Sequence, residues 1–178
     1  MTPASGWTVW LTGLPASGKS TIAHSLQDAL RQQGIQSVIL DSDELRPFLT
    51  PQATYAPEER ARFYDSVVAL AELLARQQVN IIIAATGHRR HYRQAASARL
   101  SPFYEIWVRC PLAVCRQRDP KGLYAQADQQ AESTLPGVGA LYEPPLTPAL
   151  IIDADTQHPT AAAEQIINAC ALATGPVN

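Results

Sequence analysis

The chain has 178 residues, of which 46% are hydrophobic and 17% carry a charged side chain. A chain of this length and composition can bury a core within one domain, spanning residues 1–178, and it is too apolar for a disordered tail. Its formal net charge of −2 at pH 7 argues against a dedicated nucleic-acid binder, which would carry an excess of basic residues.

The cysteines and the apolar runs indicate the compartment. Cys110, Cys115 and Cys170 are odd in number and lack Cys-x-x-Cys spacing, so we expect buried thiols in a reducing compartment, neither a disulfide framework nor a zinc site. Residues 1–6 show no signal-peptide pattern, and the longest apolar strand-like run, residues 81–85, is too short to span a bilayer. We therefore expect a cytoplasmic protein that binds neither nucleic acid nor a membrane.

Short apolar runs alternate with segments of helical periodicity, which is typical of an α/β domain. The first helix is predicted from apolar residues at helical spacing between Ile22 and Leu30, with Gly34 placed to end it. Strands separated by helices form a parallel sheet that is covered on both faces. In chain order we expect a strand at 7–12, a helix at 19–33, a strand at 37–40, a helix at 58–78, strands at 80–85, 104–108 and 149–152, and a helix at 160–172.

Residues 119–148 do not fit this alternation. The segment is rich in Gly, Pro, Gln and Ala and has no strong period. A loop of that length is usually a lid or a binding loop.

A phosphate-binding motif follows the first predicted strand. Residues 13–20 match Gly-x4-Gly-Lys-Ser/Thr in full and lie between a predicted strand and a predicted helix. The glycines let backbone N–H groups wrap a phosphate, and the helix N-terminus adds partial positive charge. Lys19 would reach the β- and γ-phosphates of ATP, and the Ser20 hydroxyl would bind Mg²⁺. The ATP-binding residues expected here are Gly13, Leu14, Pro15, Ala16, Ser17, Gly18, Lys19, Ser20 and Thr21.

Acidic residues follow the second predicted strand. Asp41 and Asp43, with Arg46 three positions further on, would lie at the crevice where parallel sheets bind ligands. They could orient an acceptor hydroxyl, help to bind Mg²⁺ and bind an anion. The alternative is a helix N-cap, in which Ser42 or Asp43 caps a short helix that begins at Glu44. The phosphate-binding motif upstream favours the functional interpretation, and capping is compatible with it.

With these motifs the chain resembles the adenylyl-sulfate kinase family, whose members transfer the γ-phosphate of ATP to the 3′-hydroxyl of adenosine 5′-phosphosulfate. The resemblance runs nearly end to end, and residues 118–124 (Arg-Asp-Pro-Lys-Gly-Leu-Tyr) are its most specific part. It implies a three-layer α/β P-loop kinase with a five-stranded parallel sheet and a lid at about 116–142, with ATP and Mg²⁺ as cofactors. Family members are often dimers. Further matching segments are 41–46, 55–60, 90–93, 103–112, 115–118, 136–137 and 142–145.

The resemblance also implies roles for individual residues. Asp43 would orient or deprotonate the acceptor hydroxyl and bind Mg²⁺ with Ser20, Asp41 would support it, and Lys19 would act on the transferred phosphate. The lid cations expected to bind ATP are Arg116, Arg118 and Lys121, for which the alternative is a salt-bridged helix end. The acceptor would be bound by Asp41, Asp43, Arg46, Tyr55, Arg60, Gly87, Arg90, Arg93, Lys121, Leu123 and Leu135. For the arginines after the third strand the alternative is a solvated helix face.

The chain departs from the family mainly on the acceptor side. Gly87 stands where the family has a serine with a proposed phosphoserine role, so no covalent intermediate can form there. Leu135 replaces one of two aromatic rings expected to enclose the acceptor adenine, and Tyr55 provides the other. Phe63 replaces an asparagine, and His88 and Arg89 replace Pro-Tyr.

Two alternatives therefore stay open. One is a kinase of the same fold that acts on another nucleotide or on a small phosphorylated metabolite. The other is a nucleotide-binding regulatory module that transfers no phosphate.

Overall fold

The computed structural model describes residues 6–172. Within this range five strands form one sheet in the order β2-β3-β1-β4-β5, and every neighbouring pair is parallel. The strands confirm the predicted set, with bounds at β1 (Thr8–Thr12), β2 (Ser37–Asp41), β3 (Asn80–Ala84), β4 (Phe103–Arg109) and β5 (Leu150–Asp153).

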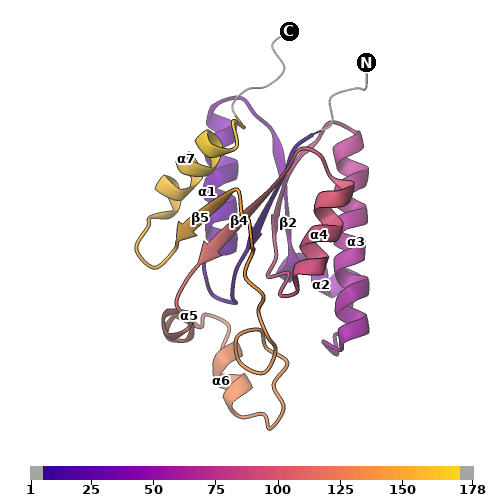
Figure 1. Ribbon diagram of the computed structural model, residues 1–178, viewed down its shortest axis with the longest axis vertical. Coiled ribbons are helices and arrows are strands. Elements are labelled where there is room, and N and C mark those ends of the chain that lie inside the picture. Colours follow the sequence, from indigo (N-terminus) through magenta and orange to yellow (C-terminus); the bar gives the residue numbers. More distant parts are fainter. Residues whose placement is uncertain (1–5, 173–178) are drawn as a thin grey trace.

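Helices cover both faces of the sheet, as Figure 1 shows. Helices α1 (Lys19–Gln32) and α7 (Pro159–Ala169) pack on one face, and α3 (Pro57–Arg76) and α4 (Arg90–Arg99) pack on the other. The three predicted helices are confirmed as α1, α3 and α7. Gly34 ends the first of them, with a φ of 77° and its N–H donating to the carbonyl of Arg31 at 3.0 Å.

The core lies on both sides of the central strand β1. Successive side chains of a strand point to opposite faces, so Val9 and Leu11 join the cluster under α1 and α7, while Trp10 joins the cluster under α3 and α4. All five residues of β1 are buried. This central strand carries the phosphate-binding motif at its carboxyl end.

Four helices lie outside the predicted set, at α2 (Ser42–Leu49), α4, α5 (Leu112–Arg118) and α6 (Leu123–Asp128). None offers the long apolar repeat by which a helix is recognised in sequence: α2 buries no residue and α5 buries only Cys115. The short helix considered at Glu44 therefore exists, but it begins at Ser42. Helix α6 lies within the 119–148 segment, which is otherwise irregular as predicted.

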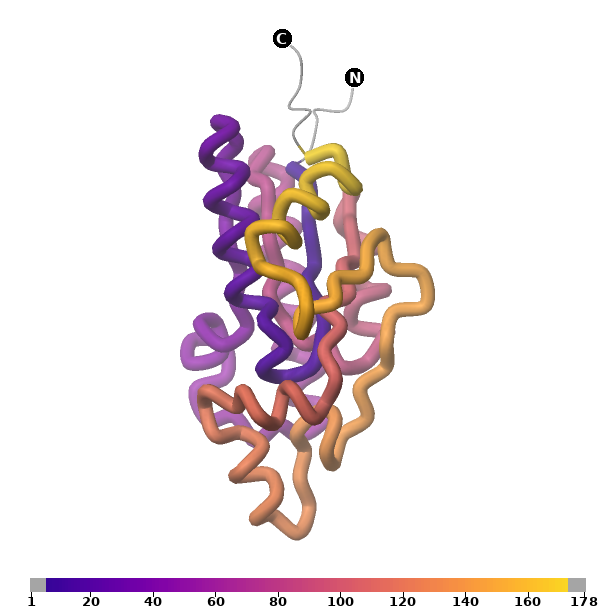
Figure 2. Tube along the Cα trace, turned by 90° about the vertical axis from the view of Figure 1, so that its left-hand side faces the viewer, coloured from indigo at the N-terminus to yellow at the C-terminus, as the bar shows by residue number. Residues whose placement is uncertain are grey.

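The segment from α5 through α6 lies beyond the carboxyl ends of the strands, at the bottom of Figure 1 and of Figure 2. We call residues 116–142 the lid. Cys110, Cys115 and Cys170 are buried and unpaired, as expected. Among residues 6–172 no helix is both long and apolar enough to cross a membrane.

Candidate active site

The loop from Gly13 to Gly18 joins β1 to α1 and depends on both glycines. A Cβ on Gly13 would lie 2.3 Å from the carbonyl oxygen of Val108 in β4, so only glycine fits there. Gly18 caps α1 with a φ of 104°, a left-handed conformation that other residues rarely adopt. No side chain caps this end of α1. Its first backbone N–H groups are therefore available to an anion, as in other phosphate-binding loops.

The Lys19 ammonium is folded over this loop. Its Nζ donates to the carbonyl oxygens of Gly13 at 3.0 Å and Leu14 at 2.8 Å. Burial lowers the pKa of Lys19 to about 8, although Asp43 and Asp41 nearby act in the opposite direction. At neutral pH the side chain is a partly buried cation at the cavity wall, which attracts phosphate more strongly than a fully exposed one.

Ser20 and Asp41 meet at the start of α1 and α2. The Ser20 hydroxyl donates to Oδ2 of Asp41 at 2.5 Å, while Oδ1 of Asp41 accepts the N–H of Asp43 at 2.8 Å. Asp41 is therefore the N-cap of α2. The helix cap considered as the alternative therefore exists, but the capping residue is Asp41 and neither Ser42 nor Asp43. This arrangement also puts Asp41, and not Asp43, beside the Ser20 hydroxyl.

Asp43 pairs instead with the lid. Its Oδ2 lies 2.6 Å from Nζ of Lys121, and both side chains are more than half exposed. The two carboxylates that follow β2 thus have different partners. Asp41 faces the phosphate-binding loop, and Asp43 faces the lid.

One cavity of about 980 Å³ connects these groups. The phosphate-binding loop lies at its centre because β1 is the middle strand of the sheet. Residues 154–159, which follow the edge strand β5, line one end, and residues from α2 and α3, which follow the opposite edge strand β2, line the other. The cavity therefore has room for two ligands that meet at the loop.

At the β5 end, Arg118 of the lid holds two loops together. Its guanidinium donates to the carbonyl oxygen of Ala154 at 2.7 Å and, at 3.4 Å, to that of Ser17 in the phosphate-binding loop. Tyr124 of α6 donates to the carbonyl oxygen of Pro15 at 2.9 Å. The lid is thus anchored directly on the phosphate-binding loop.

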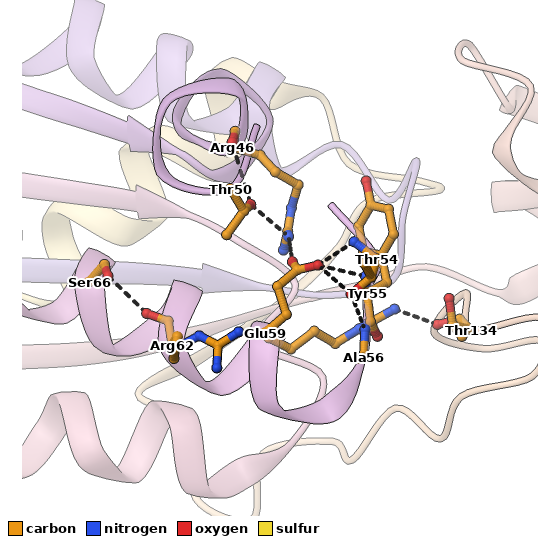
Figure 3. A network of polar contacts seen from close by, with 10 residues as sticks. Arg46, Thr50, Thr54, Tyr55, Ala56, Glu59, Arg62, Ser66 and Thr134 are labelled. Carbon is orange, nitrogen blue, oxygen red and sulfur yellow. Dashed lines mark hydrogen bonds and ion pairs between the residues drawn. The ribbon is translucent and has the colours of Figure 1, made fainter. Parts of the chain in front are cut away.

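At the β2 end, two arginines surround an aromatic ring. The guanidinium carbons of Arg46 and Arg60 lie 4.7 Å and 5.3 Å from the centre of the Tyr55 ring, and all three residues line the cavity. Arg60 also donates to the carbonyl oxygens of Tyr55 at 2.9 Å and of Thr134 in the lid at 2.6 Å (Figure 3). Leu135, next to Thr134, also lines the cavity. This wall offers cations and ring faces to an anionic, aromatic ligand.

Some residues expected at the site lie elsewhere. The Arg93 side chain is buried and donates to Glu105, to the Gly87 carbonyl and, at 2.7 Å, to the Glu143 carbonyl. Arg90 donates to the Pro144 carbonyl at 2.8 Å. Neither arginine lines the cavity, and neither does Gly87. Acceptor binding by these three residues stays a prediction.

Arg116 also has its partners within the lid, and ATP binding by this residue stays a prediction. It pairs with Asp128 at 2.7 Å, its guanidinium lies 5.6 Å from the centre of the Tyr124 ring, and it does not line the cavity. The salt-bridged helix end that was the alternative for the lid cations therefore applies to Arg116. Gly13 and Leu14 shape the loop from behind and contribute no lining surface.

The structure brings the remaining expected residues to the cavity: Pro15, Ala16, Ser17, Gly18, Lys19, Ser20, Thr21, Asp41, Asp43, Arg46, Tyr55, Arg60, Arg118, Lys121, Leu123 and Leu135.

Other lining residues were missed by sequence reasoning. Tyr64 lines the β2 end, and its hydroxyl accepts the N–H of Gly87 at 3.0 Å. Tyr64 also belongs to the buried cluster under α3 and α4, so its sequence pattern does not distinguish it from a core residue. Residues 154–159 were also missed, although they follow a parallel strand. The rule that ligands bind at the carboxyl ends of parallel strands, which indicated Asp41, applies to them as well.

Cys115 is the buried residue of α5, and its surroundings make its thiol unreactive. Burial and the neighbouring Cys110 raise the pKa of the Cys115 thiol to about 12. A thiol that stays protonated is no nucleophile, which agrees with the expected packing role.

Three comparisons relate the chain to known proteins. The adenylylsulphate kinase family model matches residues 5–153. An adenylyl-sulfate kinase of Gloeothece citriformis is 34% identical over 92% of this chain and 93% of its own length, and a probable one of Pyrococcus abyssi is 36% identical over 91% and 93%. The solved APS kinase of Mycobacterium tuberculosis, in complex with AMPPNP and APS, superposes with a TM-score of 0.88 at 30% identity, covering 95% of this chain and 99% of that one.

More distant structures share the fold alone. A sugar kinase of Janibacter superposes with a TM-score of 0.66 at 18% identity, and a gluconokinase of Sinorhizobium meliloti with 0.60 at 13%. The family match covers most of the chain, and the relatives are matched over nearly their whole length. The chain belongs to the adenylyl-sulfate kinase family of P-loop kinases.

Proposed function

We propose that the protein transfers the γ-phosphate of ATP to the 3′-hydroxyl of adenosine 5′-phosphosulfate (APS), giving 3′-phosphoadenosine 5′-phosphosulfate. The observation that carries this proposal is the single cavity, which joins a phosphate-binding loop to a wall of two arginines and a tyrosine ring. The related structure in complex with AMPPNP and APS supports the same pair of ligands.

In this proposal ATP lies along the β5 end and the loop. Lys19 and the amides at the start of α1 bind the β- and γ-phosphates, and Arg118 and residues 154–159 enclose the rest of the nucleotide. As negative charge redistributes toward the transferred phosphate oxygens, the Lys19 ammonium stabilises it at close range. The lid excludes water, which would otherwise compete with the acceptor hydroxyl.

The acceptor lies at the β2 end. Tyr55 and Leu135 enclose its adenine, while Arg46 and Arg60 bind its anionic group. Asp43 orients the 3′-hydroxyl and takes its proton as the bond to phosphorus forms. Transfer is direct and in line: the acceptor oxygen bonds to the γ-phosphorus while the bond to the β–γ bridging oxygen breaks and ADP leaves.

A magnesium ion fits the Ser20–Asp41 pair. A hydroxyl and a carboxylate 2.5 Å apart are the hard oxygen ligands that Mg²⁺ takes in kinases, where substrate phosphates and water complete its coordination. When bound, the ion would neutralise charge on the ATP phosphates. We therefore assign the ion to Ser20 and Asp41, and we leave Asp43 free to act on the acceptor.

The proposal is tested by ADP release across a panel of acceptors. APS, AMP and gluconate, each offered with Mg·ATP, separate the proposed reaction from transfer by the same fold to another acceptor. The missing ring at Leu135 is the observation that favours the second candidate. Turnover with APS alone supports the proposal, whereas turnover with a different acceptor, or with none, contradicts it.

A further inference from the structure

Glu59 occupies the centre of a hydrogen-bond network at the β2 end of the cavity (Figure 3). One carboxylate oxygen, Oε1, accepts from the Arg46 guanidinium at 2.8 Å. The other, Oε2, accepts from the hydroxyl and the N–H of Thr54 and, at 2.8 Å, from the N–H of Tyr55. Glu59 is 7% exposed and does not line the cavity. It therefore acts on the cavity only through the residues that it holds.

Tyr55 needs such a partner because of its backbone. Its φ is 57°, a left-handed conformation that is unfavourable for a residue with a Cβ. The Glu59 carboxylate fixes the N–H groups on one side of this turn, and Arg60 fixes the Tyr55 carbonyl on the other. Without the carboxylate, the N–H groups of Thr54 and Tyr55 would lose their acceptor, and one side of the turn would no longer be held.

The same carboxylate also orients the guanidinium of Arg46. Its guanidinium lies 4.0 Å from the centre of the Phe63 ring and 4.7 Å from that of Tyr55. The ion pair with Glu59 engages one nitrogen of the Arg46 guanidinium, Nη1. The rest of the guanidinium stays available at the cavity wall, held beside the Tyr55 ring.

The charge of Glu59 suits this role. Burial acts to raise the pKa of its carboxyl, but the N–H groups of Tyr55 and Thr54, the Thr54 hydroxyl and the Arg46 charge outweigh burial and leave it below its ordinary value. The group is therefore ionised at neutral pH. An ionised carboxylate accepts all four hydrogen bonds at once, which a neutral amide cannot do.

We propose that Glu59 is a positioning residue for the acceptor, holding Tyr55 and Arg46 in the orientation that binds APS. The inference rests on the proposed function, since it concerns the acceptor of that reaction. It predicts a selective defect: the acceptor site loses its shape, while the phosphate-binding loop, which Glu59 does not contact, keeps its affinity for ATP.

The test compares Glu59→Gln with Glu58→Gln in the full chain. Glu58 is the neighbouring first-turn glutamate of α3 but is exposed, so it controls for charge near the helix N-terminus. Steady-state kinetics should show the APS KM raised by about tenfold or more in Glu59→Gln with the ATP KM within about twofold of wild type. Glu58→Gln should leave both constants within about twofold. Glu59→Asp, which keeps the charge, should restore the APS KM to within about threefold of wild type.

A double-mutant cycle separates positioning from a general structural role. In a Tyr55→Ala background the turn no longer presents a ring, so Glu59→Gln should raise the APS KM by only about threefold or less. A defect of undiminished size in that background, or an equal rise in the APS and ATP KM values, would overturn the inference. If Glu59→Gln does not fold, Glu59→Asp carries the test, and an equal rise in its APS and ATP KM values counts against positioning.

The outcome also distinguishes the inference from the proposed function. Wild-type protein that does not phosphorylate APS contradicts the function itself. Wild-type protein that does so, together with a Glu59→Gln variant whose APS KM is unchanged, contradicts the inference alone.

Discussion

Asp43 in α2 and Lys121 in the lid form an ion pair across the acceptor side of the cavity, with 2.6 Å between Oδ2 and Nζ. The pair joins residues 78 positions apart in the chain. Because both side chains are more than half exposed, water competes for each of them and the pair adds little to stability. The carboxylate can therefore exchange Lys121 for an acceptor hydroxyl.

Asp43→Asn should lower kcat by at least about a hundredfold, because the amide cannot take the proton of the acceptor hydroxyl. The ATP KM should stay within about twofold, since Asp43 acts on the other substrate. Steady-state kinetics at saturating APS measures both. Asp41→Asn is the matched comparison, and it should raise the Mg²⁺ requirement. An unchanged kcat in Asp43→Asn would transfer the role to Asp41.

Arg118→Ala should raise the ATP KM by about tenfold or more, because the guanidinium that bridges Ser17 and Ala154 at the cavity is lost. Arg116→Ala is the control. It removes a neighbouring arginine of the same lid that pairs outside the cavity with Asp128. Its ATP KM should stay within about twofold. Equal effects of the two variants would contradict the assignment of Arg118.

Leu135→Phe should lower the APS KM modestly, by about tenfold or less, because a ring would complete the enclosure of the adenine opposite Tyr55. Arg60 ties Tyr55 to Thr134, so the adjacent residue 135 is held near that ring. The ATP KM should not change. An acceptor without adenine gains nothing from the second ring, and a weaker APS KM in this variant would argue against the adenine site.

His88 should make stability depend on pH in the acid range. It is buried beside Arg60 and Arg89, and its Nδ1 has no hydrogen-bond partner among residues 6–172. Burial, with some help from these two cations, lowers its pKa to about 4. The unfolded chain therefore binds a proton between about pH 6.5 and 4 that the folded protein does not, so the free energy of unfolding falls as the pH drops through this window, by up to about 3 kcal/mol.

Urea denaturation of wild type and His88→Gln at pH 7 and pH 4.5 measures this pH dependence of the free energy of unfolding. The variant lacks the titrating group, so any stability advantage of wild type at pH 7 should shrink by about 2 kcal/mol or more at pH 4.5. A difference between the two proteins that is the same at both pH values would show that His88 does not titrate in this range.

The sequence predicted the parts of the molecule that carry a period or a complete motif. The strands and helices α1, α3 and α7 have apolar faces long enough to recognise, and residues 13–20 satisfied their motif in the expected context. Helix α5 has no such apolar face, because it buries only Cys115. Asp41 and Asp43 have different partners because Asp43 pairs with Lys121 of the lid. The position of the lid in the fold cannot be predicted from a local sequence pattern.

Which arginine side chains reach the cavity cannot be predicted from the sequence. Arg93 and Arg118 are equally good anion ligands by chemistry, but Arg93 folds back onto Glu105 and the chain near Glu143, and Arg118 reaches the cavity. Arg116 and Arg118 are two positions apart on a helix, a spacing that puts side chains on different faces. That spacing alone argues against both reaching one nucleotide. Segment 55–60 matches the family, but nothing in it singles out Glu59, because the role of that residue comes from the left-handed turn at Tyr55.

The most direct test of the central claim is the position of the transferred phosphate. Wild-type protein is incubated with APS and with ATP labelled at the γ-phosphorus, and the labelled nucleotide is separated and identified. The account predicts that the label is found as a phosphate ester at the 3′-oxygen of APS, and that a 3′-deoxy analogue of APS receives none. Label at another position of APS, or label released only as inorganic phosphate, would contradict it.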